Sequence, residues 1–455
     1  MPTYESRNPY TGKLLRRYPT LGPAQVARRL AQAARAAAHW RTTTFAERAA
    51  VLHRAAELLR ERQEALARLM ALEMGKPLRD GRAEAQKCAS CCDYYAQHAA
   101  AMLADEDIKT DAGRSYLSYA PLGVVLAIMP WNFPLWQVVR FAAPALMAGN
   151  VGLLKHAPNV PQCALALTQL LHDAGLPAEA FQNLFITTEQ IAELLADDRV
   201  RAATLTGSER AGAAVAAAAG QHIKKTVLEL GGSDPFIVLA DADLELAART
   251  AAQARLINAG QSCIAAKRFI VVKSVQREFT RLLVSHLREL RYGDPLADST
   301  DYGPLARPDL ADALATQVAD SVAQGAKVEL PGGQPASGST RFDPMVLSNV
   351  RPGQRAYHEE LFGPVALVLS AKDPADALRL ANDSRFGLGA AIWTQNVAQA
   401  EVLARQLENG AVFINGLVKS MNELPFGGVK KSGYGRELSH LGIREFVNQK
   451  SVWIK

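Results

Sequence analysis

The sequence predicts an α/β protein with two Rossmann-like α/β lobes and a small additional β element. From Gly123 onward, short apolar runs typical of strands alternate with helical runs, which is the pattern of βαβ units around a parallel sheet. A second alternation of the same kind extends from about Ser233 to Gly442. The chain has 455 residues, 49% of them hydrophobic, so it can fill the cores of two or three domains.

The first lobe is expected to combine residues 1–104 with residues 122–232. Apolar residues recur at helical spacing through Phe45, Leu52 and Leu59, so residues 24–104 are predicted to be helical. The strands predicted after them are Val124–Met129, Val151–Leu154, Asn183–Ile186, Ala203–Leu205 and Thr226–Leu228.

The second lobe is expected to span residues 233–442. Its predicted strands include Phe269–Val272, Val365–Leu369 and Ala390–Trp393. Between the two parts of the first lobe, residues 105–121 are polar but rich in strand-forming types, which indicates a protruding hairpin. Residues 443–455 form a short tail of similar character, and we expect it to pair with that hairpin. An exposed strand edge of this kind favours pairing with another subunit.

Charge and composition exclude several classes. The net charge is +6 with no block of like charge, so a solvated surface is favoured over a nucleic-acid face. There is no run of about eighteen apolar residues and no signal-peptide pattern, so we expect neither a membrane span nor export. The five cysteines are sparse and odd in number, which argues against a disulfide framework and for the cytoplasm.

Three of these cysteines, Cys88, Cys91 and Cys92, share one helical face by their spacing. A zinc site would require a fourth ligand, and no histidine or cysteine lies nearby at ligand spacing. We therefore predict a packed helix face and no metal site.

Two other segments predict covalent chemistry. Cys263 ends the segment Asn258–Cys263, between a helical run and a strand-like run, and Glu229 lies in Leu228–Gly232 before a glycine turn. A free thiol has a pKa of roughly 8.5 and needs activation to react. A carboxylate can serve as the general base that hydrolyses a thioester. Together the two segments indicate thiol catalysis with hydrolytic turnover.

The segment Thr206–Gly212 allows two interpretations. It lies between a strand and a helix, where backbone N–H groups can bind a phosphate. It can equally be a simple helix cap, because the dinucleotide fingerprint with three spaced glycines is absent.

The full set of motifs resembles the aldehyde dehydrogenase superfamily over essentially the whole chain. Residues 149–158 and 430–438 are most similar to the short succinate-semialdehyde dehydrogenases. The resemblance implies a cofactor-binding domain (1–104 and 122–232), a catalytic domain (233–442) and an oligomerisation element (105–121 and 443–455) of a homodimer or homotetramer. The motifs are Pro130–Pro134, Thr206–Ser208, Leu228–Gly232, Gly260–Cys263, Glu360–Pro364 and Pro425–Gly428.

By this resemblance, Cys263 is the nucleophile that adds to the aldehyde carbon. The Asn132 side-chain amide and the Cys263 backbone N–H would hold the oxyanion, and one such donor is worth roughly 100- to 1,000-fold in rate. Glu229 would activate the water that releases the acid.

The resemblance also implies a nicotinamide cofactor. Lys155 and Trp131 would contact its riboses, Gly207 and Ser208 its pyrophosphate, and Glu360 and Phe362 its nicotinamide half. Pro158 stands where NAD-preferring members often carry a glutamate. Because proline neither repels nor binds a 2′-phosphate, we expect mixed use of NAD and NADP.

For the substrate, Arg140 lies eight residues after Asn132 and would grip a distal carboxylate, although a surface or interface salt bridge is the alternative. The resemblance adds Ser420 as an assisting hydroxyl and Trp136 as a channel wall. A second arginine of some relatives is Ile257 here. Ala265 excludes a local disulfide with Cys263.

The expected activity is NAD(P)-dependent oxidation of an aldehyde, with succinate semialdehyde favoured. A dehydrogenase for another short aliphatic or aromatic aldehyde is the main alternative. An acylating dehydrogenase, a cofactor-free thiol hydrolase and a catalytically inactive binding protein are less favoured. Glu229 predicts hydrolysis, the nucleotide motifs predict a cofactor, and Cys263, Glu229 and Asn132 are all present.

Overall fold

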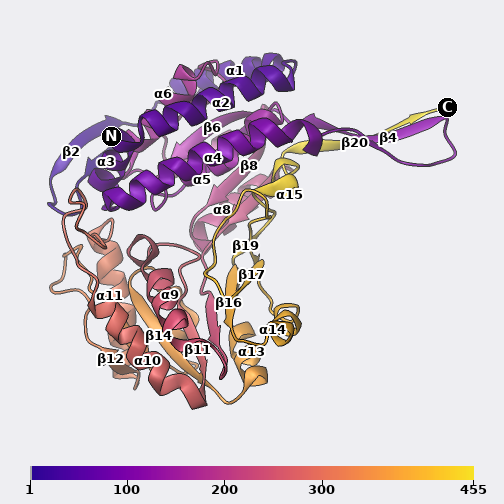
Figure 1. Cartoon of the computed structure of the whole chain (residues 1–455). Coiled ribbons are helices and arrows are strands. Elements are labelled where there is room, and N and C mark those ends of the chain that lie inside the picture. Colours follow the sequence, from indigo (N-terminus) through magenta and orange to yellow (C-terminus); the bar gives the residue numbers. More distant parts are fainter. Residues whose placement is uncertain (1–2) are drawn as a thin grey trace.

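The computed structural model describes residues 3–455 and has two lobes, each built around its own sheet (Figure 1). The first sheet has the strand order β19-β9-β8-β5-β6-β7. Five of its strands are parallel, and β19 runs antiparallel to β9. The bounds are β5 (Val124–Met129), β6 (Val151–His156), β7 (Phe181–Asn183), β8 (Val200–Thr206), β9 (Lys225–Glu229) and β19 (Gly433–Tyr434).

Helices cover this first sheet, and the prediction of helices before residue 104 is confirmed. The helix α2 begins at a capping box in which Thr44 and Glu47 satisfy each other's backbone N–H groups. The three clustered cysteines of α4 are buried in the core of this lobe, which confirms the packed helix face. The helices are α1 (Pro23–Trp40), α2 (Phe45–Glu61), α3 (Gln63–Met74), α4 (Leu78–Met102), α5 (Trp136–Met147), α6 (Pro161–Asp173), α7 (Thr188–Ala196) and α8 (Glu209–Gln221).

The second lobe contains a seven-stranded sheet in the order β12-β13-β14-β11-β10-β16-β17. Only β12 is antiparallel to its neighbour. Its central strands are buried apolar runs, as expected for a parallel sheet covered on both faces. The strands are β10 (Pro235–Val238), β11 (Arg268–Val272), β12 (Lys327–Leu330), β13 (Met345–Ser348), β14 (Val365–Ala371), β16 (Gly389–Trp393) and β17 (Ala411–Ile414); the helices are α9 (Leu244–Leu256), α10 (Lys273–Arg288), α11 (Pro308–Ala323), α12 (Arg355–His358), α13 (Pro374–Asn382) and α14 (Val397–Ala404). The short helix α15 (Ser439–Ile443) packs against α4 and α5 of the first lobe.

A long arm projects from the body and carries the C-terminus at its tip (Figure 1). It consists of β3 (Glu106–Asp107), β4 (Arg114–Pro121) and β20 (Val447–Ile454). The predicted hairpin and its pairing with the tail are confirmed, since β20 pairs with β4 along its whole length. The remaining small sheets are β1 (Thr3–Arg7) with β2 (Leu14–Pro19), and β15 (Phe386–Gly387) with β18 (Val429–Lys430).

One strand prediction was wrong. The strand expected at Asn183–Ile186 lies earlier, at β7 (Phe181–Asn183). The Phe181 ring fills the space above Gly152, where a Cβ atom would lie 2.6 Å from the ring. The residues after β7 stay buried, but their carbonyl groups do not continue the sheet. The Phe185 carbonyl accepts a hydrogen bond from the Leu21 N–H, and the Ile186 carbonyl accepts one from the Tyr4 hydroxyl. Contacts with distant segments therefore end the strand.

The two lobes are joined by more than their linking chain. The strand β19 comes from the segment assigned to the second lobe, yet Gly433 pairs with Glu229 in the first sheet. Gly433 has φ +113, and a Cβ atom there would overlap the carbonyl of Leu228, so only glycine permits this close approach.

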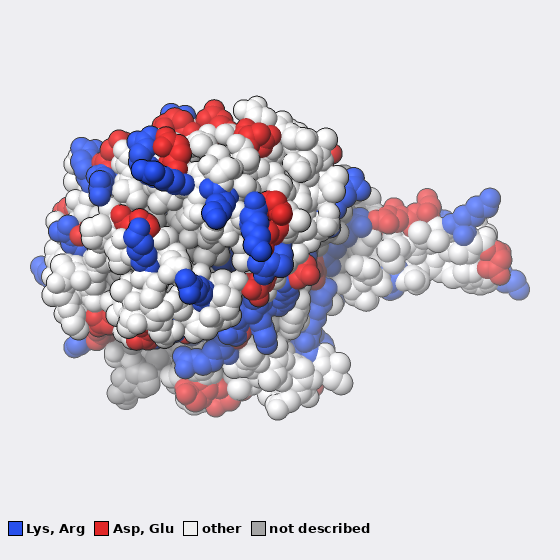
Figure 2. Space-filling model, turned by 90° about the horizontal axis from the view of Figure 1, so that it is seen from below, with Lys and Arg blue, Asp and Glu red and all other residues white. Residues whose placement is uncertain are grey.

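The surface carries both signs of charge. Figure 2 shows acidic side chains interspersed with basic ones over the face that it displays, with basic residues denser below its centre. No helix among residues 3–455 combines the length and the apolar character needed to cross a bilayer.

Candidate active site

The loop that carries Cys263 has a strained backbone. After α9, the short 3-10 helix η1 (Ile257–Gly260) contains Asn258 and Ala259 with φ values of 53° and 54°. Non-glycine residues rarely adopt this left-handed conformation, and it persists only where the surroundings hold it in place. Gly260 also has a positive φ, and the backbone of Gly363 occupies the space where its Cβ atom would lie.

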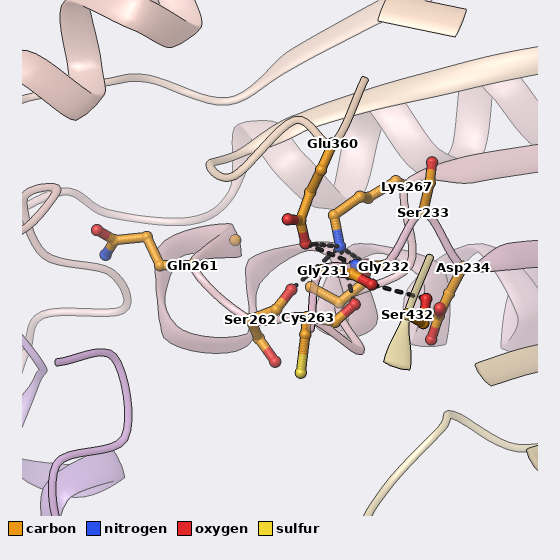
Figure 3. Close-up of polar contacts among 12 residues, drawn as sticks. Gly231, Gly232, Ser233, Asp234, Gln261, Ser262, Cys263, Lys267, Glu360 and Ser432 are labelled. Carbon is orange, nitrogen blue, oxygen red and sulfur yellow. Dashed lines mark hydrogen bonds and ion pairs between the residues drawn. The ribbon is translucent and has the colours of Figure 1, made fainter. Parts of the chain in front are cut away.

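A buried lysine holds this loop from behind. The ammonium of Lys267 donates hydrogen bonds to the carbonyls of Ser262, Cys263 and Ala265 at 3.0 to 3.1 Å. It also forms an ion pair with Glu360 at 3.6 Å. Figure 3 shows Lys267 directed at these groups, while the Cys263 sulfur points away from them. Lys267 is fully buried, so its charge is available only to these partners.

Sequence reasoning did not single out Lys267. Its signal is a lysine directly before the buried strand β11, where a charged residue needs a specific partner. The Glu360 carboxylate accepts the Gly232 N–H at 3.0 Å as well. Lys267 therefore links the nucleophile loop to the segment that carries Glu360 and Phe362.

Asn132 lies against the same loop. Its amide nitrogen donates to the Gln261 carbonyl at 2.9 Å, two residues before Cys263. Its amide oxygen accepts from Gln137 at 3.1 Å, which fixes the orientation of the amide so that its NH₂ group faces the loop. The backbone carbonyl of Asn132 accepts from Asn258 at 2.8 Å. The structure thus brings Asn132 to the nucleophile loop.

A cavity of about 690 Å³ lies beside Cys263. The cysteine, Arg140, Trp136 and Ser420 all line it, although they come from α5 and from segments far apart in the chain. Phe133 and Phe426 contribute aromatic surface. The structure therefore brings the three predicted substrate residues together with the predicted nucleophile.

Burial determines the state of the resting thiol. Cys263 is half-buried, and burial raises the pKa of its thiol to about 12. The positive charges of Arg140 and Lys267 oppose this shift but do not cancel it. At neutral pH the thiol is therefore protonated, and it needs activation during the reaction.

Arg140 and Glu229 belong to a buried group of charges. Arg140 is only 3% exposed and forms an ion pair with the buried Glu437. Glu229 is also buried, and neither of its carboxylate oxygens has a hydrogen-bond partner among the described residues. Burial raises the pKa of Glu229 well above its usual range, and the nearby Glu437 adds to this effect. Glu229 is not among the residues that line the cavity beside Cys263.

Most of the predicted cofactor residues lie at the carboxyl end of the first sheet, where α/β folds bind nucleotides, whereas Glu360 and Phe362 come from the segment before β14 in the second lobe. Lys155 is the penultimate residue of β6, and Ser208 follows β8, on either side of β5. Burial lowers the pKa of Lys155, and the contact that the structure gives its ammonium is the Tyr4 ring at 5.8 Å. The rings of Trp131 and Phe362 meet edge to face with centroids 5.9 Å apart.

Both interpretations of Thr206–Gly212 survive. The Ser208 hydroxyl accepts from Ala211 N–H at 3.3 Å and caps α8, so the helix cap is present. The first N–H groups of any helix have no partner within the helix and remain suited to an anion. A Cβ atom at Gly207 would make an ordinary contact of 3.6 Å with the Leu205 side chain, so a larger residue would not clash there. Pro158 is exposed, and because it is a proline it places no carboxylate at this position.

No group of three or more acidic, histidine or cysteine side chains is arranged to hold a metal ion within the described part of the chain.

The protein thus has two α/β lobes, and the Cys263 thiol lies on the wall of a cavity. The carboxyl edge of its first sheet is of the kind at which α/β proteins bind nucleotides. The model of the aldehyde dehydrogenase family matches residues 2–452, and the chain belongs to this family. The chain is 51% identical to the probable succinate-semialdehyde dehydrogenase [NADP(+)] of Synechocystis sp., covering 98% of both chains. It is 48% identical to the succinate semialdehyde dehydrogenase [NAD(P)+] of Escherichia coli, covering 98% of this chain and 97% of the relative.

Solved structures agree with this assignment. The succinic semialdehyde dehydrogenase of Streptococcus pyogenes, in complex with NADP+, superposes with a TM-score of 0.97. It is 37% identical to this chain, and the match covers 99% of each. The predicted resemblance and fold class are therefore confirmed.

Replacement of Lys267 by Met should destabilise the protein by roughly 3–5 kcal/mol, because three carbonyls of the loop lose their donor and the half-buried Glu360 loses its cation. Urea unfolding followed by tryptophan fluorescence measures this change. Lys273→Met, at an exposed position on the neighbouring α10, should stay within about 0.5 kcal/mol of the unmodified protein. Equal stabilities of the two variants would contradict the role of Lys267.

Proposed function

We propose that this protein oxidises succinate semialdehyde to succinate with NAD or NADP. The observation that carries the proposal is the half-buried Cys263 on the wall of a cavity that basic residues also line. Identities near 50% to succinate-semialdehyde dehydrogenases over nearly the full chain support it. Another short aliphatic or aromatic aldehyde is the alternative substrate. The five free cysteines suit a reducing compartment, so we place the protein in the cytoplasm.

In this proposal, the Cys263 sulfur forms a bond to the aldehyde carbon, and the carbonyl π electrons move to the oxygen. The thiol proton must leave as this bond forms, because the thiol is protonated at rest. The Asn132 NH₂ group, held toward the loop, and the Cys263 N–H stabilise the new oxyanion. Lys267 keeps the loop in place during attack.

The released acid requires a second reaction. After oxidation the substrate is a thioester of Cys263, and water must add to its carbon. Glu229 takes a proton from this water, so it must first be ionised. Because burial raises its pKa, the ionised fraction and the rate of hydrolysis should both increase as the pH rises through that raised pKa.

The residues at the sheet edge fit an anionic dinucleotide. Lys155 is a half-buried lysine whose ammonium lies over the Tyr4 ring, and the start of α8 offers backbone N–H groups next to Gly207. Gly207 and Ser208 would hold the pyrophosphate, Lys155 and Trp131 the riboses, and Glu360 and Phe362 the nicotinamide half. When bound, a nicotinamide cofactor would supply the hydride acceptor that the oxidation requires.

The two catalytic assignments predict different kinetic defects. Cys263→Ala should abolish reduction of the cofactor entirely. Glu229→Gln should retain a first burst of about one reduced nicotinamide per site and then turn over at least about 100-fold more slowly, because only the water step loses its base. Stopped-flow absorbance at the nicotinamide band measures both.

The exposed Glu193→Gln should behave like the unmodified enzyme. Turnover of Cys263→Ala at the original rate would refute thiol catalysis. Loss of the burst in Glu229→Gln would assign Glu229 to the earlier step instead.

Mixed cofactor use follows from Pro158, which neither repels nor binds a 2′-phosphate. Catalytic efficiencies with NAD and NADP should differ by less than about 1,000-fold. Pro158→Glu should shift the ratio toward NAD by roughly tenfold or more, because a carboxylate would repel the 2′-phosphate. The exposed Pro177→Glu serves as a control and should leave the ratio unchanged. A larger preference for NAD in the unmodified enzyme would refute mixed use.

We also propose that the arm makes the protein a homodimer or homotetramer. In the three-stranded arm sheet, β20 lies at the edge and pairs only with β4 among the described residues. Trp453 and Ile454 are 55% and 47% exposed near its end. An exposed apolar strand edge on a projecting arm is suited to pairing with a second copy.

Trp453→Asp should therefore lower the assembly state, since a buried charge in the interface is costly. Light scattering after size exclusion gives the mass of the particles. Ile223→Asp changes an exposed apolar residue, 96% accessible, on the body and should not alter the mass. A monomeric unmodified protein at micromolar concentration would rule out the assembly role of the arm.

A further inference from the structure

A buried ion pair lies directly beside the segment that carries Asn132. Lys76 precedes α4, and Glu84 belongs to that helix. Their side chains are 1% and 2% exposed, and the Lys76 ammonium donates to the Glu84 carboxylate. Taking two charges out of water can cost more free energy than their attraction returns, so such a pair is weak evidence of stabilisation. Its other contacts show what it does instead.

Lys76 holds the Asn132 segment at its beginning. The ammonium donates to the backbone carbonyl of Asn132 at 3.0 Å and lies 3.9 Å from the centre of the Phe133 ring. With Glu84, these contacts match the three N–H groups of an ammonium. The same carbonyl accepts a hydrogen bond from the Asn258 side chain of the nucleophile loop at 2.8 Å. Lys76 and the nucleophile loop therefore hold one and the same oxygen atom.

Glu84 holds the other end of the segment. Its Oε1 atom accepts the N–H groups of Leu135 and Trp136, both at 2.9 Å, while its Oε2 atom accepts from Lys76. The helix α5 begins at Trp136, and the first N–H groups of a helix have no partner inside it. A carboxylate there also complements the positive end of the helix dipole. Glu84 therefore fixes the start of α5, four residues after Asn132.

The ion pair thus controls the backbone from which the Asn132 amide extends. That amide has two N–H groups, and its nitrogen donates to the Gln261 carbonyl at 2.9 Å, so one N–H group is left for another acceptor. The direction of the remaining N–H depends on where the backbone beneath it lies. Lys76 and Glu84 both reach the cavity wall, but their polar atoms are bonded to each other and to this segment.

We propose that the Lys76–Glu84 pair positions the oxyanion donor of Asn132. The inference rests on the proposed function, in which the Asn132 NH₂ group stabilises the oxyanion that forms when Cys263 attacks the aldehyde. Lys76 and Glu84 are positioning residues, because both act through the backbone on either side of Asn132. A displacement of about 1 Å at a reacting group can cost roughly 100-fold in rate. A buried pair suits this task, since separating its charges in the core is strongly unfavourable.

The test measures the first turnover, in which the oxyanion forms. The variant Lys76→Met/Glu84→Gln removes both charges together, so neither ion is left buried without its partner. The glutamine keeps an acceptor for the N–H groups at the start of α5, whereas the Asn132 carbonyl loses the ammonium. The rate of the first nicotinamide reduction, followed by stopped-flow absorbance, should fall by roughly ten- to a hundredfold. The Kd for NADP should change by less than about threefold, because the pair acts on the chemical step.

A combination with Asn132→Ala distinguishes positioning from a general structural role. Asn132→Ala alone should slow the first turnover by roughly 100- to 1,000-fold, because the oxyanion loses a donor. Adding Lys76→Met/Glu84→Gln to Asn132→Ala should slow it by less than about threefold more, since a donor that is absent cannot also be misplaced. Losses that multiply in the combined variant would overturn the inference. An unchanged first turnover in Lys76→Met/Glu84→Gln would overturn it as well.

Two further variants complete the experiment. Arg62→Met breaks the partly exposed ion pair with Asp173 and should leave the first turnover within about twofold. Glu84→Gln alone replaces the double variant if melting temperatures show that the latter does not fold, and it should slow the first turnover by roughly two- to tenfold. Multiplying losses with Asn132→Ala would again contradict positioning. If Asn132→Ala itself keeps the original rate, the oxyanion assignment in the proposed function is wrong, and the role of the pair falls with it.

Discussion

The site depends on one buried ammonium. Lys267 has exchanged the water around its charge for three carbonyls of the nucleophile loop and the carboxylate of Glu360. This arrangement compensates for the left-handed backbone at Asn258 and Ala259, because the loop cannot relax without breaking those bonds. It also explains how Cys263 can be partly exposed to a cavity while a hydrogen bond from Lys267 holds its main-chain carbonyl. The Lys267 side chain therefore contacts both the loop that carries Cys263 and the segment that carries Glu360 and Phe362.

Buried charge has a second role in the first lobe. Arg140, Glu437 and Glu229 are all withdrawn from water, and two negative groups share one positive group. Burial and the neighbouring Glu437 raise the pKa of Glu229, and strongly shifted pKa values of this kind are common at catalytic sites.

Much of the architecture was predictable because local signals agree with the fold. Apolar residues recur at helical spacing before residue 104, and they form continuous runs at β5, β11 and β14. In each case the apolar pattern of the sequence already implies which side chains are packed in the core. The error at Asn183–Ile186 has a different origin, since Phe181 and Ile186 take their places from contacts with distant segments. At the site, motifs located Cys263, Asn132 and Ser420. Lys267 was missed because a lone lysine carries no motif, and only the folded chain shows the carbonyls and the carboxylate that surround it.

The short strand β19 has a consequence for motion. It returns from the second lobe to bond with the end of β9, directly at Glu229. A hinge motion that separated the lobes would have to break the backbone hydrogen bonds between β19 and β9, next to Glu229. Because these backbone hydrogen bonds would be lost, the pairing favours ligand entry and product departure through movements of side chains and loops over a separation of the lobes.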